Sequence, residues 1–482
     1  IVAPTIPSEV ITPNNPPTGW GILGDIYSRG WQRTDNTNNF LSFFATFAYS
    51  FKNRYVVNAN VRNDASNVFG QDINHRIDPT YSFGLSWRAS EEAFFQKHLK
   101  WITTLNFRGT FGIQGNALTR ESPELILSQQ GVQPGYNRYF STIGQIPNPY
   151  LSWERTRNWN FGVDLELVRM FYMNLEYYTR RSNAVITVDL PFEYGIDDMK
   201  RNGGIIYNRG IEYTLSFTPI QKRDFSLNIN LNASKNWNKG GETKIDRNTA
   251  MYLRGGSTQI LKEGYPLSAF WSYSFAGLDG SNGKPMFNYV EVPDEEKSKS
   301  IDPTTYLVYS GETEPYFTGG LGFSFRYKSL SLNTSFSLLL GSKKRLPSPY
   351  SDFQGSGSMM PDPTKNVNRD LLNRWQKPGD EVYTNIPGLP TWPIEIGWTL
   401  PNTDSAESAI EMWEKSDAMV VSGSFLRCRN IGLSWQMKKE WCDKIHAKNL
   451  AINFNMDNIF VIASKRFNGF DPELENSIRP RS

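Results

Sequence analysis

The segment 211–233, with the sequence IEYTLSFTPIQKRDFSLNINLNA, alternates apolar and polar residues in two consecutive runs. Successive side chains of a β-strand point to opposite faces, so each run predicts a strand with one apolar and one polar face. The residues between the runs, 219–224, are mainly polar and begin with Pro219, which favours a turn. The segment therefore predicts an antiparallel hairpin whose polar face is rich in asparagine, serine and threonine.

The same alternation recurs along most of the chain and predicts an all-β fold. Most of the expected strands are close to the roughly 9–11 residues that a tilted strand needs to cross a hydrocarbon core, whereas strands of globular domains usually have about 5–6. We expect about fourteen strands, at residues 40–51, 55–62, 81–88, 101–112, 158–167, 171–180, 211–217, 225–233, 268–276, 284–290, 321–327, 330–340, 426–437 and 449–460.

The connections between these strands alternate in length, as in outer-membrane barrels with short periplasmic turns and long external loops. Residues 1–39, rich in proline, asparagine and glycine, are expected to be an extracellular loop segment. Residues 40–482 are expected to form a partial transmembrane β-barrel. Its longest extracellular loops would be 113–157, 181–210, 234–267 and 341–425. The last should contain helical pieces at 368–375 and 405–413, the second capped by Asp404.

A soluble β-sandwich shows the same alternation in any single strand, so the membrane interpretation depends on the whole pattern. The sequence has no run of about 18 apolar residues that could form a membrane helix. The apolar faces are uniformly leucine, phenylalanine, tyrosine and valine, which suits lipid, and the polar faces suit a water-filled lumen. We therefore expect Ile229 to face lipid and Asn230 to face the lumen. The net charge of +3 argues against a nucleic-acid partner.

Eight segments, distributed over nearly the whole sequence, resemble the SusC/RagA-like TonB-dependent transporters of the Bacteroidetes outer membrane. They are NRYVVNANVRNDASNVFG (53–70), DPTYSFGLSWRASEEAFF (78–95), FGIQGN (111–116), PNPYLSWERTRNWNFGVDLEL (147–167), NRGIEYTLSF (208–217), EGYPLSAFWSYSFAGLDGSNGKPMF (263–287), SFLRCRNIGLSW (424–435) and DNIFVIASKRFNGFDPE (457–473).

The resemblance implies a 22-stranded barrel around an N-terminal plug, with 449–460 as the penultimate strand and 40–51 as the eighth. The plug, the TonB box, the first seven strands and the closing strand would lie outside this sequence, so these residues alone would not close a barrel. The implied function is TonB-dependent active import of oligosaccharides or oligopeptides across the outer membrane. The implied partners are a SusD-like lipoprotein that caps the barrel and the TonB–ExbB–ExbD complex, and no enzyme activity is implied.

Two alternatives remain open at this stage. One is a TonB-independent porin-like or structural outer-membrane barrel, and the other is a soluble surface glycan-binding β-protein. A TonB box and plug upstream in the full gene would separate the importer from the first. Detergent-free partitioning into the aqueous phase would favour the second.

The sequence offers little catalytic chemistry. The three histidines, His75, His98 and His446, have no second ligand at metal spacing, so we expect no catalytic or metal site from them. Cys428 and Cys442 match no metal or redox spacing, which leaves two separate thiols or a disulfide.

Ligand contacts are expected from the external loops and the upper lumen. Trp375, Tyr383, Trp392 and Trp398 in the longest loop could bind sugar faces or peptide groups, and the alternative is that they pack the loop or a partner lid. No cofactor is expected.

Two further side-chain expectations concern carboxylates. Calcium could bind at Asp279, Asn282 and Gly283, where a tight turn uses the same residues. Asp164 and Glu166 share the lumen face and should pair with arginines such as Arg180.

Overall fold

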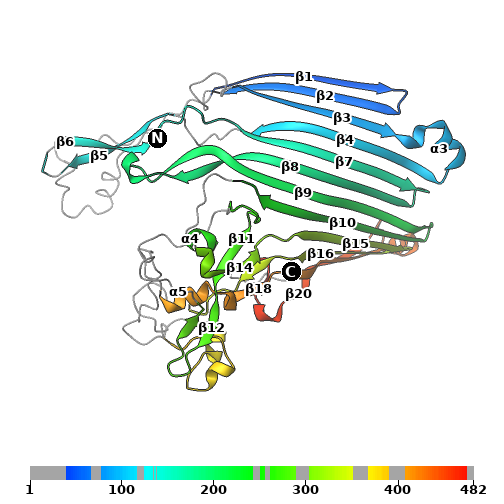
Figure 1. Cartoon of the computed structure of the whole chain (residues 1–482). Coiled ribbons are helices and arrows are strands. Elements are labelled where there is room, and N and C mark those ends of the chain that lie inside the picture. Colours follow the sequence, from blue (N-terminus) through cyan, green and yellow to red (C-terminus); the bar gives the residue numbers. More distant parts are fainter. Residues whose placement is uncertain are drawn as a thin grey trace, which may run out of the picture.

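The computed structural model describes residues 39–66, 77–116, 124–133, 135–136, 138–242, 250–255, 261–288, 303–350, 367–389 and 408–474. Twelve antiparallel strands form one large sheet, which is open between its edge strands β1 and β20 in this part of the chain (Figure 1). In sheet order they are β1 (Phe40–Phe51), β2 (Tyr55–Ser66), β3 (Ile77–Arg88), β4 (Ile102–Asn116), β7 (Glu154–Leu167), β8 (Phe171–Asp189), β9 (Asp198–Gln221), β10 (Phe225–Gly240), β15 (Phe317–Tyr327), β16 (Leu330–Leu340), β19 (Phe425–Gln436) and β20 (Ala451–Ala463).

The antiparallel all-β prediction is confirmed, but two predicted strands do not join the sheet. Residues 268–276 and 284–290 instead contain the short strands β11 (Ala269–Tyr273), β12 (Phe275–Leu278) and β13 (Pro285–Phe287), and β10 pairs directly with β15. β11 is buried along its whole length, as expected for a strand packed inside a domain. The sheet thus has twelve strands instead of about fourteen. In a 22-stranded barrel whose penultimate strand is β20, β1 would be the tenth strand.

At one end of the sheet the connections are short. β1–β2 turns at Lys52 and Asn53, and β15–β16 turns at Lys328, each with a positive φ. The connections 89–100 and 438–448 contain η1 (Ala89–Glu91), α3 (Ala93–His98) and α6 (Lys439–Lys444). Of the turn predicted at 219–224, only residues 222–224 connect the two strands, because β9 extends to Gln221.

At the other end, three predicted loops contain regular structure. The prediction of a loop at 181–210 is wrong, because β8 and β9 remain paired as far as Asp189 and Asp198, with η2 (Phe192–Tyr194) at the tip. The segment 113–157 contains a hairpin of β5 (Ile126–Gln133) and β6 (Arg138–Gln145). The segment 234–267 begins with the last residues of β10 and contains α4 (Ala250–Leu253).

The connections between β10 and β15 and between β16 and β19 fold together into what we call the loop domain, the described residues within 241–316 and 341–424. Leu267 N donates to Asn238 Oδ1 at 2.7 Å and Gly240 N donates to Tyr265 O at 2.8 Å, which ties the domain to the end of β10. Its other elements are η3 (Pro303–Thr305), β14 (Leu307–Glu312), β17 (Lys343–Arg345), η5 (Arg369–Asn373), η6 (Asp380–Val382), α5 (Ala409–Glu414), η7 (Asp417–Met419) and β18 (Val420–Ser422).

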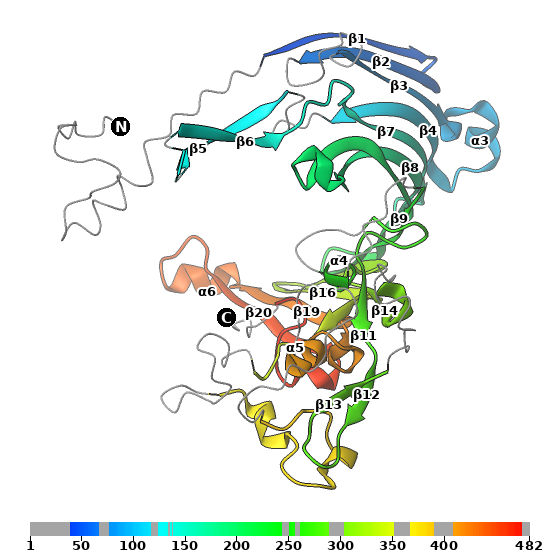
Figure 2. The ribbon, with the colours of Figure 1, turned by 60° about the vertical axis from the view of Figure 1, so that its left-hand side comes forward.

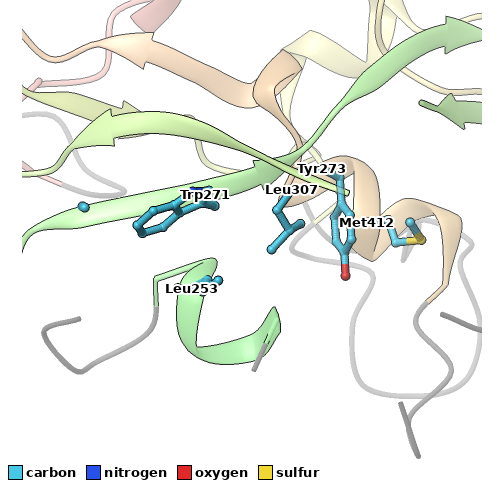
Figure 3. Close-up of a cluster of buried hydrophobic side chains, with 6 residues drawn as sticks. Leu253, Trp271, Tyr273, Leu307 and Met412 are labelled. Carbon is cyan, nitrogen blue, oxygen red and sulfur yellow. The ribbon is translucent and has the colours of Figure 1, made fainter. Parts of the chain in front are cut away.

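Two hydrophobic clusters form the core of the loop domain. The first consists of Leu253, Ala269, Trp271, Tyr273, Leu307 and Met412, and Figure 3 shows how α4, β11, β14 and α5 contribute to it. The second consists of Tyr350, Leu371, Ile410, Trp413 and Met419. The buried hydrophobic core therefore lies mainly in the loops, beyond the end of the large sheet.

The start of α5 differs from the prediction. The helix begins at Ala409, and its N-cap is Ser408, whose Oγ accepts from Glu411 N at 3.2 Å while Glu411 Oε2 accepts from Ser408 N at 3.0 Å. This reciprocal pair is a capping box. Asp404, the predicted cap, lies outside the described residues. η5 lies within the predicted helical piece 368–375.

The register gives the large sheet one apolar and one polar face. Ile229 lies opposite Phe217 and Phe323, whereas Asn230 lies opposite Ser216 and Gly322. Directly opposed residues share a face, so the apolar parity continues from strand to strand. The sheet curves strongly from β1 through β9 to β20 (Figure 2). Side chains of the apolar face are exposed, including those of Phe83, Leu85, Trp159, Phe161, Tyr177, Leu332, Leu433 and Phe454.

No helix among the described residues is both long enough and apolar enough to cross a membrane.

Candidate functional site

The polar face of the large sheet carries side chains that meet across an intervening strand. Arg108 on β4 extends over Gly162 on β7 and places Nη2 2.9 Å from Glu176 Oε1 on β8 and 3.3 Å from Asp164 Oδ1. A Cβ atom at Gly162 would lie 3.1 Å from that nitrogen. Asn174 Nδ2 donates to Asp164 Oδ1 at 2.8 Å. The glycine therefore leaves room for the guanidinium, which a side chain at this position would displace.

The predicted pairing with a lumen arginine is confirmed for Asp164, but the arginine is Arg108 and not Arg180. Asp164 pairs with Arg108, and Glu166 accepts a hydrogen bond from Thr104 Oγ1 at 2.9 Å. Arg180 instead lies over the ring of Tyr178, 4.7 Å from its centroid. The register explains the difference, because Asn106 and Arg108 on β4 are the cross-strand neighbours of Asp164 and Gly162, whereas Arg180 is opposite Asn158.

A second bridge crosses β9. Tyr178 Oη on β8 donates to Asn236 Oδ1 on β10 at 3.2 Å, passing over Gly210. A Cβ atom at Gly210 would lie 2.5 Å from that hydroxyl oxygen. Farther along β10, Asn228 Nδ2 donates to Thr218 Oγ1 at 2.8 Å and Asn230 Nδ2 donates to Asn228 Oδ1 at 2.5 Å. The polar face thus offers amides and hydroxyls that can hydrogen-bond neutral polar solutes.

A pocket of about 460 Å³ opens at the long-loop end of this face. Arg62 and Asp64 form its charged side, with 2.7 Å between Arg62 Nε and Asp64 Oδ2. Arg62 Nη2 also donates to Ser42 Oγ at 3.3 Å. The rest of the lining comes from Phe40, Thr80, Ile113, Gln114, Gly115 and Trp153. These residues come from β1, β2, β3, β4 and the segment before β7. The sequence shows that Ser42, Arg62 and Thr80 lie on the polar face of their strands, but it does not show that these separate strands form a pocket.

The structure gives the predicted loop aromatics different surroundings. Trp375 is half-buried, donates from Nε1 to Glu381 Oε2 at 3.1 Å and packs its ring against Gly283 and Gly388. Tyr383 follows η6 and is 91% exposed. Trp392 and Trp398 lie outside the described residues. Trp375 thus packs the loop domain, while the exposed ring of Tyr383 is available for contact.

Asp279, Asn282 and Gly283, for which the sequence left a tight turn or a calcium site, lie in a hydrogen-bonded turn between β12 and β13. Asp279 Oδ1 accepts from Ser281 N at 2.8 Å and Ser281 Oγ at 2.7 Å, and Oδ2 accepts from Asn282 Nδ2 at 3.2 Å. The serine hydroxyl and backbone N–H lower the pKa of Asp279. No three His, Cys, Asp or Glu side chains gather at metal-binding distance in the described part of the chain. Calcium binding by Asp279, Asn282 and Gly283 stays a prediction.

The segment that follows β20 is held by a buried ion network that sequence analysis missed. Arg427 on β19 places Nη2 2.6 Å from Asp471 Oδ1 and Nε 2.9 Å from Glu473 Oε2, and the side chains of Arg427 and Asp471 are 2% and 5% exposed. Arg429 Nη2 lies 2.7 Å from Glu473 Oε1. Asn468 Nδ2 donates to Asp370 Oδ1 at 2.7 Å, which joins this segment to the loop domain. The signal for this network in the sequence was a pair of arginines, Arg427 and Arg429, separated by one residue.

Arg345 joins several elements inside the loop domain. Its Nη2 donates to Trp271 O at 2.6 Å, its Nη1 donates to Arg254 O, and its guanidinium lies 4.9 Å from the centroid of the Phe270 ring. Burial lowers the pKa of Arg345 to about 10, so the side chain keeps its charge at neutral pH.

Cys428 and Cys442 are separate buried thiols, as one of the two alternatives predicted.

Comparison with known proteins shows which protein family the large sheet is similar to. A family model described as "TonB dependent receptor-like, beta-barrel" matches residues 7–341. A TonB-dependent receptor of Formosa agariphila is 24% identical over 93% of this chain and 45% of its own length. The TonB-dependent receptor SusC of Bacteroides thetaiotaomicron is 25% identical over 92% of this chain and 42% of its own length. The structure of the RagAB peptide transporter matches with a TM-score of 0.69 and 23% identity, over 90% of this chain and 45% of that chain. The chain thus spans less than half the length of these proteins.

Proposed function

Because the chain belongs to the TonB-dependent receptor-like β-barrel family of outer-membrane transporters and receptors, we propose that it is part of the wall of a TonB-dependent importer of oligosaccharides or oligopeptides. The family is not an enzyme class. The observation that carries the proposal is the large sheet itself, whose exposed apolar face suits lipid and whose polar face is lined by hydrogen-bonded amides and hydroxyls. Such neutral groups can exchange hydrogen bonds with sugars and peptide backbones as these solutes move past. They do not hold back solutes of one charge.

The uptake step requires no covalent chemistry from these residues. The ion pairs of the polar face, such as Arg108 with Glu176 and Asp164, offset part of its charge. In a TonB-dependent importer, the energy for opening would come from TonB and ExbB–ExbD acting on a plug. Binding near Arg62 and Asp64 in the pocket at the long-loop end would select the solute before it enters the lumen.

We propose that a SusD-like lipoprotein docks on the surface of the loop domain. Leu372, Val382 and Tyr383 are 71%, 78% and 91% exposed and lie on or beside η5 and η6. Exposed large apolar side chains of this kind are typical of protein interfaces. We infer that a lid docks here, which also gives Tyr383 a role as partner contact or ligand contact.

Uptake measurements in cells test this function. A strain lacking the full gene is complemented with the gene or with a copy whose TonB box is deleted, and import of labelled oligosaccharides and oligopeptides is followed. We expect saturable import of one of the two solute classes that is lost on deletion of the TonB box and on addition of a protonophore. Unsaturable uptake of small solutes that survives both treatments would contradict the importer and support the porin-like alternative.

A further inference from the structure

Six exposed cations on β7–β10 share the parity of the apolar face just beyond its apolar residues at the long-loop end, and five of them remain when Arg155, which pairs with Asp78 at 2.7 Å, is set aside. We call them the basic girdle: Arg157, Arg181, Arg209, Lys235 and Lys239. Arg157 lies directly opposite Arg181, Arg209 opposite Trp237, and Lys239 opposite Tyr207. Each has the same parity as the apolar residues nearer the middle of its strand, such as Trp159 and Ile211. The girdle therefore faces outward, toward the surroundings of the barrel wall.

Three cations of the girdle, Arg181, Arg209 and Lys235, lie near aromatic rings. Lys235 Nζ lies 4.9 Å from the ring centroid of Trp237 and 5.6 Å from that of Tyr316, and the guanidinium of Arg209 lies 5.8 Å from the same Trp237 ring. Within the described residues, none of the five forms an ion pair with a carboxylate. Directly opposed like charges, such as Arg157 and Arg181, destabilise a sheet. A bound anion would relieve this repulsion.

An apolar groove of about 340 Å³ begins next to the girdle. Its lining consists of apolar residues and glycines and includes Leu231, Ala233, Phe317, Gly319, Phe336 and Leu338. Ala233 and Gly319 lie directly opposite each other, so two small residues leave space between larger side chains. Lys235 is two residues beyond Ala233 on the same face and lies opposite Phe317. The basic girdle and the apolar groove thus form one continuous surface.

We propose that this surface binds one anionic lipid of the leaflet on the long-loop side, with its phosphate at Lys235 and Arg209 and one acyl chain in the groove. The groove lies on the face that meets hydrocarbon, where acyl chains are the available occupants, and it offers nothing to a polar solute. Lipid phosphates lie at the membrane interface, where tryptophan, tyrosine, lysine and arginine are also placed. The phosphate would contact the cations and the acyl chain would fill the groove, so one lipid accounts for both parts of the surface.

Native mass spectrometry of the full-length protein tests the proposal. The protein is purified from outer membranes in a mild detergent, stripped of lipid and titrated with dimyristoylphosphatidylglycerol or dimyristoylphosphatidylcholine, which share acyl chains and differ in charge. We expect tighter binding of phosphatidylglycerol. The double variant Lys235→Gln/Arg209→Gln should weaken phosphatidylglycerol binding by about five- to thirtyfold and leave phosphatidylcholine unchanged, since each Lys or Arg near an anionic lipid contributes about 1 kcal/mol.

The same hairpin supplies the control. Lys222→Gln/Arg223→Gln removes two cations at the short-turn end of β9 and β10 and should leave both affinities unchanged. Ala233→Leu, which fills the groove, should weaken both lipids alike. Equal binding of the two lipids to the unmodified protein would overturn the proposal without any variant. Equal loss of phosphatidylglycerol binding in the two double variants would also overturn it.

Discussion

Arg108 on β4 and Glu176 on β8 form an ion pair across the intervening strand β7, with 2.9 Å between Nη2 and Oε1, because Gly162 leaves the space between them. Similar contacts over Gly210 join Tyr178 to Asn236. Side chains on strands that are two apart in the sheet can meet only where the middle strand carries no side chain on that face. These glycines therefore determine how the polar face is lined.

Substitution of this glycine tests the relationship. We expect Gly162→Leu to lower the free energy of unfolding by about 1–3 kcal/mol, the usual cost of overpacking, because the new side chain displaces the Arg108 guanidinium. Gly322→Ala is the control on the same face, since the nearest atom to its added Cβ is 3.9 Å away. The temperature at which the folded band is lost in semi-native electrophoresis measures both. Equal shifts for the two variants would refute the role of Gly162.

The buried pair of Arg427 and Asp471 predicts a larger effect. We expect Arg427→Met to destabilise the segment after β20 by about 3–5 kcal/mol, because Asp471 would lose its guanidinium while remaining buried. Arg429→Met removes a cation whose side chain is 35% exposed, and it should cost about 1 kcal/mol or less. Limited proteolysis within residues 464–474 reports the difference. Cleavage that is no faster in the first variant than in the second would contradict the prediction.

The apolar surface of η5 and η6 predicts a docking contact for the lipoprotein partner. Val382→Asp and Tyr383→Asp should each weaken co-purification of the lipoprotein, with a loss of affinity of about tenfold or more if these are anchor residues. Val308→Asp changes an exposed apolar residue on β14 and serves as the matched control. Retention of the lipoprotein by both η6 variants would remove this surface from the interface.

Glu414 predicts a pH dependence within the loop domain. Burial raises the pKa of Glu414, and Ser348 Oγ donates to its Oε1 at 2.5 Å. The folded state therefore holds a proton more tightly than the unfolded state, and stability decreases as pH rises from the ordinary glutamate value of 4.5 through the raised pKa. Glu414→Gln should abolish the part of the decrease in stability that arises from this carboxyl group. Hydrogen exchange of residues 408–419, corrected for intrinsic rates, should show a smaller pH slope in the variant, and an unchanged slope would contradict the prediction.

Strand positions and faces were predictable where lipid and water impose a strict period of two. The strand 40–51 and the turn at Lys328 follow directly from that alternation. The alternation did not predict how far β8 and β9 extend beyond residue 180, because paired strands outside the bilayer need no uniform apolar face. It also failed at Trp271 and Tyr273, which alternate like sheet residues but pack with Leu253 and Met412 in the loop domain.

The site was harder to predict because it depends on contacts between distant residues. The sequence left Trp375 between ligand contact and packing of the loop, and its ring packs against Gly388 and against Gly283, from a much earlier part of the chain. The partner of Asp164 depended on the register between β4 and β7. Tertiary packing, rather than local pattern, decides both.

The assignment of an apolar face to lipid and a polar face to the lumen is tested most directly by comparing Ile229→Arg with Asn230→Arg, neighbours on opposite faces of β10. The yield of folded, heat-modifiable barrel in the outer membrane is measured for the full-length protein. Ile229→Arg should reduce the folded yield, at a cost of about 2–4 kcal/mol for a position at the midplane, whereas the change at Asn230 should be tolerated. Equal folded yields for the two variants would contradict the assignment.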